Sequence, residues 1–122
     1  MPINNVCNCP HPPGGQVVCE PNQMAVCIIV NGQARQQCLN PPDEINNALA
    51  LVTWALSEIT IERKRSYSSI TNQEIRILAS GEYNFNNISV TFSLPQKIKT
   101  ALEEIINNRG MSSGHEREVE TS

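Results

Sequence analysis

Residues 24–38 read MAVCIIVNGQARQQC, and this stretch decides the N-terminal part of the fold. Its first seven residues are apolar and rich in β-branched side chains, which favour a strand. The dipeptide Asn31-Gly32 follows them, and it is a strong hairpin signal because a type I′ turn needs positive φ at both central residues. We therefore predict a hairpin with a two-residue loop, in which Ala25 faces Cys38.

The whole segment 1–42 differs in composition from the rest of the chain. It holds all five cysteines but only two charged residues, Glu20 and Arg35. Residues 17–20 are predicted to add a third strand, so the segment forms either a β-hairpin or a three-stranded meander. The stretch 9–15, CPHPPGG, contains three prolines. Because proline fits neither a helix interior nor a central strand, we expect an irregular arm there.

The remaining chain is amphipathic and carries three helical patterns. The first begins at Asn40-Pro41-Pro42-Asp43, where asparagine can cap and proline is tolerated in the first turn. Its apolar residues recur at helical spacing and form one stripe: Ile45, Leu49, Val52, Leu56 and Ile59. Trp54 lies within this pattern and is expected in the core.

The two later helices have recognisable ends. One begins with a capping box from Thr71 to Glu74 and ends by Gly81. The other has a similar start at Ser93 and ends at Gly110. Between them, two short strands flank Asn86-Asn87 and predict a second hairpin.

Together these patterns predict an α+β fold, with a Cys-rich N-terminal hairpin or meander followed by a three-helix body with a second short hairpin. We divide the chain into a Cys/Pro/Gly-rich β segment (1–42), a helical body (43–110) and a disordered tail (111–122).

The only group of residues in the sequence that suggests a chemical site consists of the five cysteines and one histidine: Cys7, Cys9, His11, Cys19, Cys27 and Cys38. Thiolate and imidazole ligands suit a tetrahedral zinc, which an arm and a hairpin could hold together. Disulfides are the main alternative, but an odd number of cysteines and the lack of a signal peptide in this sequence argue against them. A third possibility is that the thiols are simply buried apolar groups.

Other activities lack the residues they need. Asp43 is the only aspartate, and capping explains it, so Asp-based magnesium sites and catalytic triads are poorly supported. The chain carries 9 Lys+Arg against 12 Asp+Glu, which gives no general attraction to nucleic acid. The basic run 63–65 is interpreted as the end of a helix, where cations complement the dipole. No apolar run is long enough to cross a membrane.

These features predict a small cytoplasmic, non-enzymatic interaction or adaptor protein with a possibly zinc-stabilised β segment and no catalytic residues. Its partner would be another protein or a second copy of itself, because depletion of charged residues marks the cores of interfaces. No nucleic-acid or membrane partner is expected. The alternative is a redox-active or metal-dependent enzyme that uses the same thiols.

Overall fold

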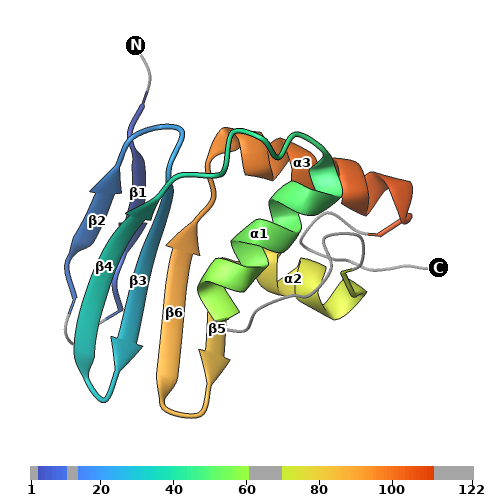
Figure 1. Cartoon of the computed structure of the whole chain (residues 1–122). Coiled ribbons are helices and arrows are strands. Elements are labelled where there is room, and N and C mark those ends of the chain that lie inside the picture. Colours follow the sequence, from blue (N-terminus) through green and yellow to red (C-terminus); the bar gives the residue numbers. More distant parts are fainter. Residues whose placement is uncertain (1–2, 11–13, 61–69, 112–122) are drawn as a thin grey trace.

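An antiparallel sheet with helices on one face and a two-stranded hairpin on the other organises the chain (Figure 1). The computed structural model describes residues 3–10, 14–60 and 70–111. It confirms the α+β class. In chain order the elements are β1 (Asn5–Asn8), β2 (Gln16–Cys19), β3 (Met24–Val30), β4 (Gln33–Leu39), α1 (Ala48–Thr60), α2 (Asn72–Ser80), β5 (Glu82–Phe85), β6 (Ile88–Ser93) and α3 (Gln96–Asn108).

The predicted hairpin is confirmed as the pair β3–β4. Ala25 faces Cys38, and Asn31 and Gly32 both adopt positive φ, at 53° and 80°. The second hairpin, β5–β6, is also confirmed. The strand order is β4-β3-β6-β5, so β3 pairs with a strand from the far end of the chain, and β4 lies at one edge.

Side chains of β3 alternate between two layers, because successive residues of a strand point to opposite faces. Val26 and Ile28 join the main core with the helices, in which Trp54 is also buried as predicted. Ala25 and Cys27 point to the other face and form a smaller cluster with residues of β1 and β2. Strand β3 therefore contributes side chains to both apolar clusters, one on each face of the sheet.

The strand predicted near residues 17–20 exists as β2, but it does not extend the hairpin into a meander. It pairs instead with β1, a strand that the sequence analysis did not predict. The Asn5 side chain fixes this pair to the sheet, because its Nδ2 donates to the Gln23 and Ser93 carbonyl oxygens at 2.7 and 2.8 Å. Ser93 Oγ in turn donates to Asn5 Oδ1 at 2.6 Å.

The first helix begins later than predicted. Helix α1 starts at Ala48, and Asn47 caps it by accepting a hydrogen bond from the Ala50 N–H at 2.8 Å. The start at Asn40 was therefore wrong. Residues 42–45 form an isolated turn closed by the Ile45 N–H and the Pro42 carbonyl, and regular helix begins only where a side chain caps the free N–H groups.

The second helix matches its prediction, with the reciprocal capping box of Thr71 and Glu74 and a left-handed C-cap at Gly81. Helix α3 begins at Gln96 after Pro95 and not at Ser93, which ends strand β6. The basic run 63–65 and all but the first residue of the predicted tail lie outside the described residues. The division of the chain into segments 1–42 and 43–110 stays a prediction. None of the helices in the described ranges has an apolar stretch of the length that a membrane span requires.

Candidate functional site

Two disulfides join the β1–β2 hairpin region to the main sheet. Cys9 bonds to Cys27 of β3, with a Cα–Cα distance of 5.7 Å. Cys19 of β2 bonds to Cys38 of β4, with a Cα–Cα distance of 5.6 Å. Cys27 and Cys38 lie on the same face of the β3–β4 hairpin, and each finds its partner in the layer stacked on that face. The two bonds therefore cross-link the layers at neighbouring strands.

These bonds overturn the zinc prediction. Four of the six proposed ligands are consumed in disulfides, and Cys7 is a buried free thiol. His11 lies outside the described residues. Among the residues that the structure does describe, no group of three or more His, Cys, Asp or Glu side chains could hold a metal ion. The prediction of a zinc-stabilised adaptor is therefore wrong.

Among the described residues, Cys7 is the one free thiol left for the alternative of an enzyme that works through thiols. Burial raises the pKa of the Cys7 thiol above its ordinary value of 9.0, whereas a reactive thiol needs a lowered pKa and access to solvent. The two disulfides do not support the predicted cytoplasmic location, because disulfides persist in oxidising compartments and are rare in the cytosol.

On the opposite face of the sheet, the helices leave strand β4 uncovered. Figure 1 shows them gathered over the β6 side, while β4 lies at the far edge. The inward-facing side chains of β4 are those opposite Val26, Ile28 and Val30. They border an open groove of about 720 Å³ between β4 and α1, which we call the β4 groove. Its lining residues are Ile28, Val30, Asn31, Gln33, Ala34, Arg35, Gln37, Ser57 and Glu58.

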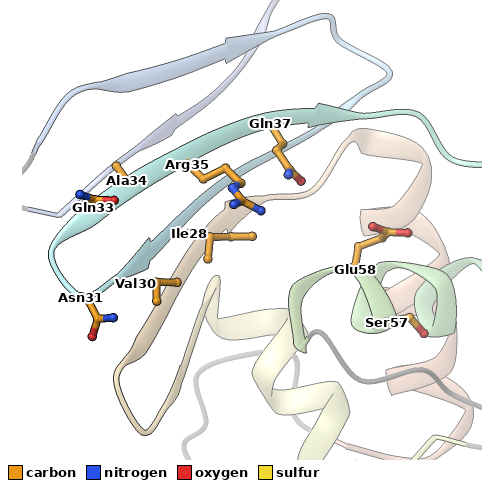
Figure 2. A pocket seen from close by; sticks show the side chains of 9 residues that line it. All are labelled: Ile28, Val30, Asn31, Gln33, Ala34, Arg35, Gln37, Ser57 and Glu58. Atoms are coloured by element: carbon orange, nitrogen blue, oxygen red, sulfur yellow. The ribbon is translucent and has the colours of Figure 1, made fainter.

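The β4 groove has an apolar floor and polar walls. Ile28 and the 40% exposed Val30 form the floor. Arg35 and Gln37 project from β4 toward α1, which contributes Ser57 and Glu58 from the other side (Figure 2). Within the described part of the chain no ion pair joins Arg35 to Glu58. The groove therefore presents one cation and one anion, together with side-chain amides that can both donate and accept hydrogen bonds.

Sequence reasoning did not identify this groove. The signal was present in the polar residues at 33, 35 and 37, which lie on one face of the strand opposite apolar residues of β3. A strand facing a covered core would carry apolar residues at these positions. These three polar residues therefore indicated an inner face that no helix covers.

Comparison with known proteins places the chain in no family. No protein-family model, no curated protein and no solved structure matches it.

Proposed function

We propose that this chain is a disulfide-stabilised binding domain of an oxidising compartment, and that the β4 groove takes up a segment of a partner polypeptide. The observation that carries the proposal is a pair of opposite charges, the exposed Arg35 and the half-buried Glu58, which line one groove without pairing to each other in the described residues. Unpaired charges at a groove with an apolar floor are suited to a ligand that brings its own complementary groups.

The rigidity of the groove supports this proposal. Its floor strand β3 and its wall strand β4 each carry a cysteine that is bonded to the opposite layer, Cys27 and Cys38. These bonds restrict relative movement of the two strands. A binding surface held in its bound geometry loses less conformational entropy on association, and this improves affinity without added contacts.

The chemistry of the walls favours a polypeptide ligand. Asn31, Gln33 and Gln37 carry amide groups that match the N–H and C=O groups of a peptide backbone. Arg35 can bind a carboxylate through two parallel hydrogen bonds, and Glu58 can accept from a lysine or arginine. The apolar floor accommodates one aliphatic side chain between them. A segment with an acidic residue, an aliphatic residue and a basic residue would use all three features.

A peptide-display selection on the oxidised protein tests the proposal. We expect enriched peptides to shift the backbone amide resonances of β4 and of the end of α1 around Glu58, and to lose binding in Arg35→Glu. Exchange of both charges, in Arg35→Glu with Glu58→Arg, should select peptides with the reversed order of charges. Enriched peptides whose shifts map elsewhere, or whose binding ignores both charge reversals, would contradict the proposal.

A further inference from the structure

In the described part of the chain, the outer edge of β4 carries a row of backbone N–H and C=O groups without hydrogen-bond partners. Val30 and Gln33 close the two-residue loop, so they form a hydrogen-bonded pair of the β3–β4 ladder. Hydrogen-bonded and non-hydrogen-bonded pairs alternate along an antiparallel ladder. The N–H and C=O groups of Ala34, Gln36 and Cys38 therefore point away from β3. Within the described residues they make no backbone hydrogen bond outside the ladder.

We infer that this edge pairs with the same edge of a second copy of the chain, in antiparallel orientation about a two-fold axis at Gln36. The outward-facing residues are centred on Gln36 and spaced two residues apart, which is the spacing that an antiparallel ladder requires. In this arrangement Ala34 of each copy pairs with Cys38 of the other. All outward groups of both strands are then satisfied, and the two sheets become one continuous sheet.

Neighbouring registers satisfy fewer groups. If Ala34 pairs with Gln36, Cys38 is left beyond the partner strand, and the two copies of Arg35 lie directly opposite each other, which is repulsive. If Gln36 pairs with Cys38, Ala34 is left unpaired. The centred register instead places each Arg35 opposite Gln37 of the other copy, whose amide oxygen can accept a hydrogen bond. Symmetry and charge thus select the same register.

The other free edge of the sheet is a poorer template. Strand β5 has four residues against seven in β4, and it begins with the exposed Glu82. A short edge strand that carries a charge is a common protection against pairing. The pairing through β4 uses the outward backbone groups of the strand and leaves its helix side open. It also places the groove residues Arg35 and Gln37 at the dimer seam, so self-association and ligand binding share these two side chains.

Light scattering after size-exclusion chromatography tests the pairing. We expect the oxidised full chain to approach twice its 13.5 kDa mass as concentration rises, and Gln36→Pro to remain monomeric, because proline removes the outward N–H at the centre of the interface. Gln36→Ala is the matched control. It loses the side-chain contact of Gln36 Nε2 with Cys9 Sγ at 3.6 Å but keeps the N–H, so it should still dimerise.

A second pair of variants tests the register. It predicts a gain in dimer affinity, and a misfolded variant would not show such a gain. Gln33 and Gln37 flank Arg35 at equal distance on the same face of β4, but only Gln37 faces Arg35 of the other copy. Two new ion pairs in Gln37→Glu should tighten the dimer by roughly two- to thirty-fold at low salt, and Gln33→Glu should give no such gain. A wild-type chain that stays monomeric up to its solubility limit, or an equal effect of both glutamates, would overturn the proposal.

Discussion

Reduction of the two disulfides should remove a large part of the stability of the fold. The bonds close loops with sequence separations of 18 and 19 residues. For loops of this length, the restriction of the unfolded chain contributes about 3 kcal/mol per bond. The sum is comparable with the whole unfolding free energy of many small domains, roughly 5 to 15 kcal/mol. We therefore expect the reduced protein to be close to its unfolding transition at room temperature.

Urea unfolding followed by circular dichroism measures this loss, with the oxidised and the reduced wild-type chain compared under otherwise equal conditions. Replacement of Cys19 and Cys38 by alanine should cost about 3 kcal/mol. Replacement of Cys9 and Cys27 should cost more, because both side chains are buried and their removal also leaves a cavity.

The control for the cavity is Cys7→Ala, which removes a buried sulfur atom but no bond. Its cost should be clearly smaller than that of either paired replacement. Equal unfolding free energies for the oxidised and reduced proteins would refute the reasoning, and so would a Cys7→Ala variant as unstable as the two double variants.

Three further predictions follow from particular residues. Burial raises the pKa of the Cys7 thiol above 9.0, so the contribution of the neutral thiol to stability is complete below that pH and is lost as the pH rises through the raised pKa. The free energy of unfolding should therefore fall more steeply with rising pH in the wild type than in Cys7→Ala, and an identical slope would contradict this. Thr71→Ala removes the capping box of α2 and should cost about 1 kcal/mol in urea unfolding, whereas an unchanged midpoint would show that the cap is unimportant. A fragment of residues 43–110 lacks β3, whose Val26 and Ile28 lie in the main core, so we expect it to lose its helical circular dichroism; a stably helical fragment would show that the body folds alone.

Local signals in the sequence were sufficient for the elements that are fixed by local chemistry. Asn31-Gly32 determines both the turn and the register of β3–β4, and the Thr71–Glu74 box determines the start of α2. The start of α1 could not be read in the same way, because Asn40 and Asn47 are both possible caps. The choice between them depends on how the chain leaves β4, which is a tertiary property.

The disulfide pairing needed information that the sequence does not contain. The register of the hairpin places Cys27 and Cys38 on one face as diagonal neighbours, and this spacing is too wide for a bond between them. Their actual partners lie in the β1–β2 layer, and β1 has only four residues, too few to show a clear alternation. Because the sequence does not indicate β1, it predicts residues 9–15 as an irregular arm. The cysteines in and next to this arm are then available for a metal in the sequence-based interpretation. Because the β1–β2 layer stacks on the main sheet, Cys9 and Cys19 meet Cys27 and Cys38, and these cysteines form disulfides and not a zinc site.

The covalent state of the cysteines in the native protein tests the central claim most directly. Digestion without reduction, followed by mass spectrometry, should yield the linked peptides Cys9–Cys27 and Cys19–Cys38. Cys7 should be alkylated only when the protein is unfolded before the reagent is added. Five thiols that react with the alkylating agent in the unfolded, unreduced protein, or any other pairing, would contradict the account.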